Sequence, residues 1–143
     1  MVLRLRLGLG LICAAMVAGC GGSSPSPESV VRAWSQELNS GDNDAAAKLF
    51  APGAEVVQGG TTIRLDTHAQ AVAWNAALPC SGRIVSIETT GNMARATFVL
   101  GDRTTSKCDG PGERATAIFR VTKGKIVLWH QTGDTPVPTG PPI

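Results

Sequence analysis

The sequence predicts an α+β domain in which three helices come first and a mostly antiparallel sheet follows, with the helices packed on one face of the sheet. Three observations lead to this prediction. Apolar residues recur at helical spacing from Val30 to Leu38, and a capping-box pattern at Thr67 and Gln70 opens a later helical run. From Arg83 onward, the chain changes to strand-like runs rich in Ile, Val, Thr and Phe.

The first helix is expected to begin at Pro27, because Ser26 is a favourable N-cap and proline suits the first helical position. A Ser-Gly pair ends it. A second, short helix is expected to follow, with Asp42 or Asp44 as its cap and Pro52-Gly53 at its end. Its expected buried residues are Ala45, Leu49 and Phe50.

Two short strands are expected next, Ala54 to Gln58 and Thr61 to Leu65, joined by a Gly-Gly turn. The capping box then opens the third helix, which Pro79 closes. Four longer strands follow, with hairpin turns after the first and third and a polar loop from Gly101 to Gly112 between the second and third. Their expected ranges are Arg83 to Thr90, Met93 to Leu100, Glu113 to Thr122 and Lys125 to Gln131.

The first twenty residues have the pattern of a secretory signal. Arg4 and Arg6 precede an apolar run from Leu7 to Ala18 that is too short to span a membrane. Small residues are followed directly by Cys20, which resembles the bacterial lipobox. The resemblance implies that residues 1–19 are removed and that a lipid on Cys20 anchors the protein to the extracytoplasmic face of the cell membrane. An ordinary secretory signal with a chance cysteine is the alternative.

The remaining chain divides into three segments. Residues 20–26 carry the expected lipid and form a flexible Gly/Ser tether, residues 27–132 form one domain, and residues 133–143 form an extended Pro-rich tail. The formal charge of +2 comes from the two arginines of the signal. The neutral mature chain has no basic footprint for nucleic acid and no polybasic patch for a membrane, so the lipid would provide the attachment.

Cys80 and Cys108 remain once Cys20 carries the lipid. An even pair in an oxidising compartment predicts a disulfide, and two free thiols are the alternative. Neither cysteine has a His or Cys partner at ligand spacing, so no metal site is expected. Nucleotide loops and Ser/His/Asp patterns are also absent from the sequence, and no cofactor is expected.

Three stretches of sequence resemble nuclear transport factor 2-like domains, which include ketosteroid isomerases and SnoaL-like polyketide cyclases. The resemblance covers Pro27 to Thr132 and implies a curved sheet wrapped around the helices as a cone with an apolar pocket. It also implies that such domains pair through the outer sheet face, either with a second copy or with another envelope protein. The stretches are Val31 to Trp34 with Asn39 to Asp42, Ala46 to Val56, and Gly124 to His130.

The resemblance places Trp34 where the isomerases have a tyrosine, and Gln58 where they have a proton-transferring carboxylate. An indole N–H is a far poorer acid than a phenol, and an amide does not take up a proton near neutral pH. The chain has no tyrosine to replace the first group. Isomerase chemistry of this type is therefore not expected, and no catalytic residue is assigned.

The residues that could line an apolar pocket are Trp34, Gln58, Trp74, Trp129 and His130. His130 follows Trp129 directly, so only one of the two faces the helices, and the sequence leaves both registers open. Core packing is the alternative role for the tryptophans.

Three polar residues outside this set are expected at the surface. His68 is expected to be exposed at a helix start, and Asp102 and Arg103 are expected in a solvent-exposed turn. The function predicted from the sequence is that of a non-enzymatic, lipid-anchored envelope domain that binds a small apolar ligand or another protein. A cavity enzyme of the isomerase or cyclase type, with a rearranged acid–base set around His130, is the alternative.

Overall fold

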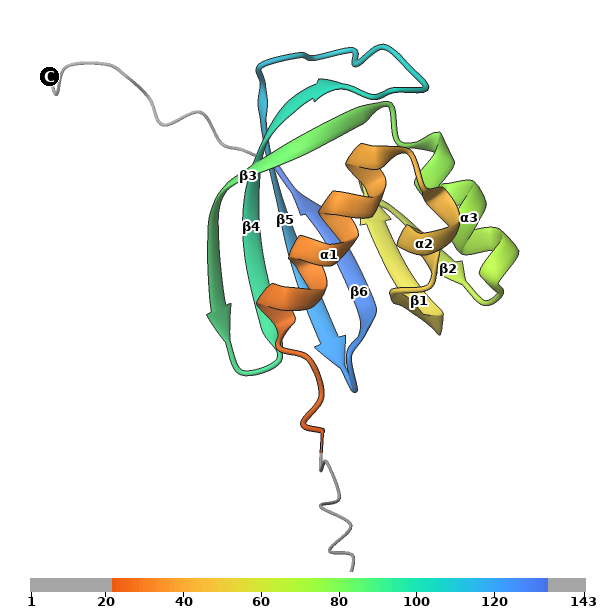
Figure 1. Cartoon of the computed structure of the whole chain (residues 1–143), viewed down its shortest axis with the longest axis vertical. Coiled ribbons are helices and arrows are strands. Elements are labelled where there is room, and N and C mark those ends of the chain that lie inside the picture. The colour runs from red at the N-terminus through yellow and green to blue at the C-terminus, as the bar shows by residue number, and fades with distance from the viewer. Residues whose placement is uncertain (1–21, 134–143) are drawn as a thin grey trace, which may run out of the picture.

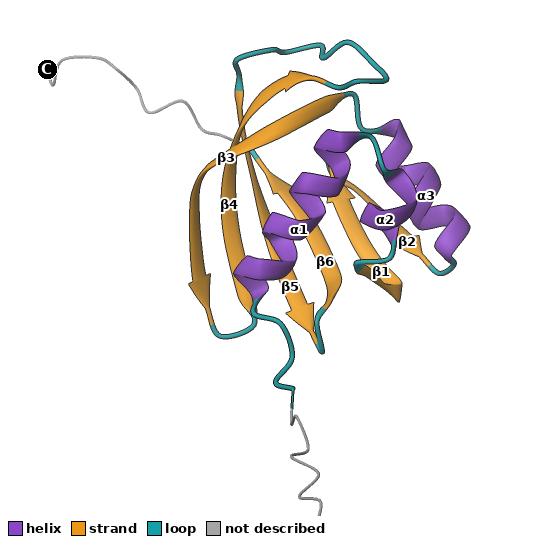
Figure 2. Ribbon diagram, in the orientation of Figure 1, coloured by secondary structure: helices purple, strands orange, loops and turns teal. Residues whose placement is uncertain are grey.

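The computed structural model describes residues 22–133 as an α+β fold, with three helices against one face of a curved six-stranded sheet (Figures 1 and 2). The predicted fold class is confirmed. Cys20, residues 1–19 and almost all of the Pro-rich tail lie outside the described residues. The elements are α1 (Pro27–Ser40), α2 (Asn43–Ala47), β1 (Phe50–Gln58), β2 (Thr61–Leu65), α3 (His68–Ala77), β3 (Cys80–Thr90), β4 (Met93–Asp102), β5 (Arg114–Thr122) and β6 (Lys125–Thr132).

The sheet has the strand order β2-β1-β6-β5-β4-β3. Strands β3 to β6 form an antiparallel meander, and β1 and β2 form a hairpin. The two parts join where β1 pairs with β6 in parallel, with Val56 opposite Trp129. The last strand of the chain therefore connects the early hairpin to the rest of the sheet.

Helix α1 crosses the sheet and contacts β3, β4 and β5 (Figure 1). The side chain of Ser26 accepts a hydrogen bond from the backbone N–H of Ser29 at 3.2 Å, which confirms the predicted N-cap. The buried residues of α1 include Trp34 and Leu38. Gly41 ends the helix with a φ of +83°, a left-handed conformation that glycine adopts without steric cost.

The second helix is shorter than the sequence predicts. It ends at Ala47, and Phe50 is the first residue of β1 rather than a buried helix residue. Strand β1 runs through Pro52-Gly53, because the pairing with β6 shifts register between Phe50 and Glu55. Such an irregularity accommodates a proline inside a strand, so these two residues bend a strand and do not end a helix.

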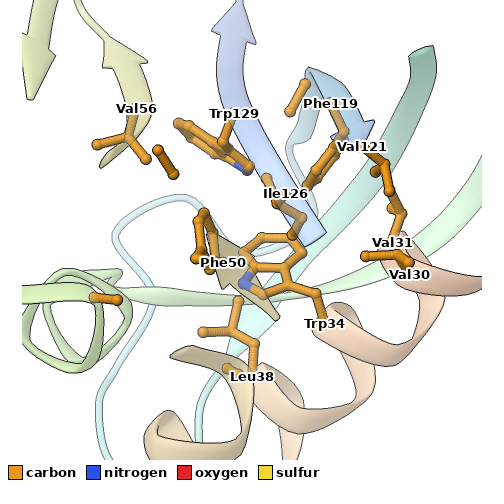
Figure 3. Packing of buried hydrophobic residues seen from close by; sticks show 14 of the residues in the cluster. Val30, Val31, Trp34, Leu38, Phe50, Val56, Phe119, Val121, Ile126 and Trp129 are labelled. Carbon is orange, nitrogen blue, oxygen red and sulfur yellow. The ribbon is translucent and has the colours of Figure 1, made fainter. Parts of the chain in front are cut away.

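One continuous core lies between the helices and the sheet (Figure 3). Phe119 and Ile126 are completely buried, and Trp34 of α1 points toward the same space as Trp129 of β6. All six aromatic residues of the chain belong to one network of ring contacts. Such rings contribute about 0.5–1.5 kcal/mol per pair beyond the area that they bury.

The predicted disulfide between Cys80 and Cys108 is present, with the two Cα atoms 4.5 Å apart. It ties the first residue of β3 to the loop between β4 and β5. No helix within residues 22–133 is long and apolar enough to cross a membrane.

Candidate ligand-binding cavity

A cavity of about 290 Å³ opens between α1, the end of α3, the start of β3 and the central strands. Its volume is at the small end of the range for ligand sites, about 300–1,000 Å³. Most of its wall is apolar. The larger apolar residues of this wall are Trp34, Leu38, Leu78, Phe98, Leu100 and Trp129. Ala115 and Ala117 of β5 also line it.

Trp34 forms part of the wall, but its polar atom is already bonded inside the protein. The indole Nε1 donates to Asn75 Oδ1 at 2.8 Å, and Asn75 Nδ2 donates to the backbone oxygen of Ala71 at 2.8 Å. Asn75 is completely buried on α3. The residue that the resemblance aligns with a catalytic tyrosine therefore joins α1 to α3.

Trp129 is buried like Trp34, but its indole Nε1 has no hydrogen-bond partner among the described residues. Its side chain is only 6% exposed, and its ring lies 6.5 Å from that of Trp34 between centroids. Trp74 lies behind it, with a centroid distance of 5.0 Å, and also contacts Phe50. Trp74 therefore supports the wall without lining the cavity.

Gln58 lines the cavity from β1, as expected, together with Gln131 of β6. Gln58 Nε2 donates to Gln131 Oε1 at 2.8 Å. This bond leaves the oxygen of Gln58 and the NH₂ group of Gln131 available to a ligand. The amide pair offers both a hydrogen-bond acceptor and a donor, but no group that titrates near neutral pH.

His130 does not line the cavity, contrary to the expectation from the sequence. Trp129 lies opposite Phe119 and Val56, which are both buried on the helix side of the sheet. His130 lies opposite Ile118, one position further along β5. Because successive strand residues point to opposite faces, His130 belongs to the outer face.

The mouth of the cavity lies beside the disulfide and carries two carboxylates. Asp109 and Glu113 both line it, and Asp109 Oδ1 lies 3.4 Å from Cys80 Sγ. Neither carboxylate forms an ion pair with a residue in the described range. The lining includes no lysine, arginine or histidine among residues 22–133, so both charged groups at the cavity are negative.

Arg103 is buried, which contradicts the expectation of a solvent-exposed turn residue. Its side chain is 5% exposed, and burial lowers the pKa of its guanidinium. Nη1 donates to the backbone oxygens of Asn75 at 2.7 Å and Leu78 at 2.8 Å. Nη2 donates to Asn43 Oδ1 at 2.6 Å and to the backbone oxygen of Leu38 at 3.4 Å.

This arrangement has a physical reason in the ends of two helices. The oxygens of Leu38 and Asn75 belong to the last turns of α1 and α3, where the helix dipole is negative. Each also accepts one capping N–H, from Gly41 at 3.1 Å and from Leu78 at 3.3 Å, and can accept a second bond. A guanidinium supplies donors and a compensating charge at once. Arg103 therefore fastens both helix ends to the loop between β4 and β5.

Further bonds hold the same loop against the start of β3. Ser106 Oγ donates to the backbone oxygen of Pro79 at 2.9 Å, beside the Cys80–Cys108 disulfide. The backbone N–H of Cys108 donates to Asp102 Oδ1 at 2.9 Å and lowers the pKa of Asp102, with a smaller contribution from Lys107. The mouth of the cavity is thus built on a fixed loop.

Two other groups of polar residues could attract attention, and neither carries a second site. His68 Nε2 lies 2.7 Å from Asp44 Oδ1, but both side chains are exposed, which confirms the surface position expected for His68. Hydrogen bonds from Lys48 and then His68 lower the pKa of Asp44. Cys80, Cys108 and Asp109 lie at metal-ligand spacing, but the disulfide consumes both thiols.

The sequence did not indicate Ser35, Gly82, Asp109 or Glu113 as cavity residues, although all four line it. A Cβ at Gly82 would lie 3.0 Å from the ring of Phe98, so this glycine allows β3 to approach the cavity wall closely. The two acids are separated from the tryptophans by long stretches of sequence. Only the disulfide prediction could have suggested that their loop folds back toward α3.

No protein-family model matches the sequence, and no curated protein matches it. Solved structures do resemble the fold. A nuclear transport factor 2-like protein from Cytophaga hutchinsonii is 13% identical, with a TM-score of 0.64 over 78% of this chain and 93% of that chain. A proposed polyketide cyclase from Sinorhizobium meliloti is 18% identical, with a TM-score of 0.62 over 73% of this chain and 94% of that chain.

A third structure was determined with a ligand. It is a protein of ketosteroid isomerase-like fold from Catenulispora acidiphila in complex with trimethylamine, 18% identical, with a TM-score of 0.60 over 78% of this chain and 88% of that chain. At these levels of identity the likeness establishes the fold alone. The curved sheet and helices of this chain therefore have the nuclear transport factor 2-like arrangement, with a cavity inside it.

Proposed function

We propose that this protein is a non-enzymatic ligand-binding domain held at the extracytoplasmic face of the cell membrane by a lipid on Cys20. The observation that carries the binding part is the aromatic-walled cavity of about 290 Å³. Apolar walls with a few polar groups are typical of small-molecule sites. The ligand would be small and largely apolar, with a group that bonds to the amides of Gln58 and Gln131.

The absence of catalysis is proposed from the groups inside the cavity. The donor of Trp34 is bonded to Asn75, and the amide of Gln58 is bonded to Gln131. General acid–base catalysis needs a titrating group within reach of the reacting atoms. The titrating groups that line the cavity within residues 22–133 are the two carboxylates of its mouth, which are exposed to solvent.

A lipid on Cys20 would orient the cavity relative to the membrane, because the N-terminal segment and the cavity mouth lie at opposite ends of β5. The described N-terminal segment lies at the turn that follows β5, where Pro25 packs beside Gly124, whereas Glu113 at the cavity mouth directly precedes β5 (Figure 1). The nine residues of β5 span about 30 Å. A chain anchored through its N-terminus would therefore present the open end of the cavity away from the membrane.

A cavity-blocking variant tests ligand binding. The full-length protein is purified in detergent from its membrane, and bound small molecules are extracted and identified by mass spectrometry. Ala115→Leu should fill the cavity and remove the bound molecule. Ala76→Leu, at an exposed position of α3, is the matched control and should retain it. Retention of the same molecule by both variants would contradict a cavity site.

The lipid anchor requires a separate test. Cys20→Ser should abolish lipidation, so the protein should remain uncut or be released from the membrane fraction. Metabolic labelling with an alkyne fatty acid, followed by membrane fractionation, measures both effects. A Cys20→Ser protein that still carries label and partitions as a mature lipoprotein would contradict the anchor.

The alternative function is a cavity enzyme, which is suggested by the structural similarity to a proposed polyketide cyclase. The non-enzymatic proposal expects no turnover of an unsaturated ketosteroid by the full-length protein. Turnover that Glu113→Gln removes would assign the acid–base role to the cavity mouth.

A further inference from the structure

We infer that the ligand of this cavity is a small organic cation, with its apolar part among the aromatic rings and its ammonium group near Asp109 and Glu113. This inference rests on the proposed ligand-binding function and specifies its ligand class. The charge of the lining and the character of the wall lead to it independently of each other.

The first observation is the one-sided charge of the cavity. Asp109 and Glu113 are its charged lining residues within the described range, and neither has an ion-pair partner there. Backbone bonds fix Glu113: its oxygen accepts from Leu100 N–H at 2.8 Å, and its N–H donates to the oxygen of Gly110 at 3.1 Å. Like charges at the opening of a low-dielectric cleft concentrate a potential that attracts the opposite charge.

The second observation is the aromatic wall directly inside that mouth. Trp34 and Phe98 meet edge to face with centroids 6.2 Å apart, and Trp129 completes the wall at 6.5 Å from Trp34. All three rings line the cavity. Ammonium groups are attracted to the faces of such rings, and tryptophan gives the strongest attraction.

The third observation is the unpartnered donor in this wall. Trp129 is 94% buried and lines the cavity, and its Nε1 has no hydrogen-bond partner among residues 22–133. A buried N–H without a partner costs about 1–3 kcal/mol. A ligand that also carries a hydroxyl or carbonyl oxygen would provide the missing acceptor, after a small movement of the ring.

The same features act against anionic ligands. A fatty-acid or other carboxylate in this cavity would find two like charges at the mouth and no basic lining residue in the described part of the chain. Its negative charge would then lose hydration without gaining a partner. The cavity should therefore discriminate by charge among molecules of similar shape.

Two probes of one shape test this discrimination. Benzyltrimethylammonium carries a positive charge, and neopentylbenzene has a carbon in place of its nitrogen and is neutral. Quenching of tryptophan fluorescence in the full-length protein in neutral detergent measures both affinities. We expect the cation to bind at least about tenfold more tightly, and this preference to shrink when salt rises from about 50 mM to about 500 mM.

A double variant assigns the preference to the two carboxylates. Asp109→Asn with Glu113→Gln should weaken binding of the cation roughly tenfold and change binding of the neutral probe less than about twofold. Glu88→Gln is the control, because Glu88 lies opposite Arg95 on the outer face of the sheet, whereas its neighbour Ile87 packs against the core. It should change neither affinity.

Three other outcomes of these binding experiments would contradict the inference. Equal affinities for the two probes would overturn the cation inference and leave the ligand-binding function intact. A cation preference that survives in the double variant would also overturn it, because the charge would then be recognised elsewhere. Failure of both probes to bind would contradict the inference and the proposed cavity function together.

Discussion

Residues 103–113 contain two kinds of charge without an opposite partner, and the structure treats them differently. Arg103 is a buried cation that forms no ion pair among the described residues; its Nη1 and Nη2 donate to four oxygens, and its Nε has no partner there. Asp109 and Glu113 are exposed anions that form no ion pair among the described residues. A few residues of one loop separate these two regions.

This difference indicates how the role of a charged residue without an ion-pair partner can be inferred. The charge of Arg103 is used inside the protein, since oxygens at two helix ends replace the missing carboxylate. The charges at the cavity mouth have no such internal use. An unpaired charge whose terminal donors are bonded to oxygens of the protein indicates a structural role, and one that faces a cavity without partners indicates a role toward another molecule.

Removal of the buried cation should have the largest effect. Arg103→Met keeps the length of the side chain but removes the guanidinium bonds to the oxygens of Leu38, Asn75 and Leu78. We expect a loss of about 4 kcal/mol in the free energy of unfolding, measured by urea denaturation. A loss below about 1 kcal/mol would contradict the structural role of Arg103.

A second arginine provides the control for this prediction. Arg120→Met changes an exposed residue of β5 and should alter the free energy of unfolding by no more than about 0.5 kcal/mol. Arg103→Lys should fall between the two, because a lysine keeps the charge but cannot reach the same set of oxygens.

The disulfide should have the next largest effect, because it supports both regions of the loop. Replacement of Cys80 and Cys108 by serine should lower the free energy of unfolding by about 3 kcal/mol. It should also weaken binding of the cationic probe, since Asp109 is next to Cys108. Unchanged denaturation midpoints for the wild-type protein with and without reductant would contradict this prediction.

Asn75 connects Arg103 to Trp34 of the cavity wall, and its substitution should cost less. Its backbone oxygen accepts from Arg103, and its side chain accepts from Trp34. Asn75→Leu should leave the indole N–H of Trp34 buried without a partner and lower the free energy of unfolding by about 2 kcal/mol. Ala76→Leu, on the exposed side of the same helix, is the matched control. A loss as small as that of the control would contradict this prediction.

The smallest effect should come from Asp102 and should depend on pH. The N–H of Cys108 keeps the pKa of Asp102 below its ordinary value, so Asp102 favours the folded state above about pH 4. This contribution is lost as the pH falls through the folded-state pKa. Between about pH 5 and 2.5, the melting temperature should therefore fall less steeply with decreasing pH for Asp102→Asn than for the wild-type protein. Equal slopes of melting temperature against pH for the two proteins would contradict this assignment.

Local signals in the sequence predicted most of the fold. The capping box of α3 forms as expected, with Thr67 and Gln70 bonded to each other's backbone N–H groups. The hairpins and the disulfide were predicted for similar reasons, because turn chemistry and cysteine parity are properties of a few residues. Phe50 was misplaced because its partner, Ile126 of β6, is far away in the sequence.

The candidate site was predicted only in part for the same reason. Trp34, Gln58 and Trp129 line the cavity as expected, whereas His130 does not, because a register shift between β5 and β6 decides which residues face the helices. Arg103 gave no local sign of burial, since its partners come from three separate helices. Only tertiary structure places those oxygens around it.

The parallel pairing of β1 with β6 sets the order in which the chain can fold. The meander of β3 to β6 is built from neighbouring segments, whereas β1 must wait for a strand that begins at Lys125. Contacts between distant segments form slowly, because the intervening chain must first be ordered. The early hairpin of β1 and β2 thus has no sheet to join until nearly the whole domain is available. A chain that folds only after export would therefore remain open until β6 has crossed the membrane.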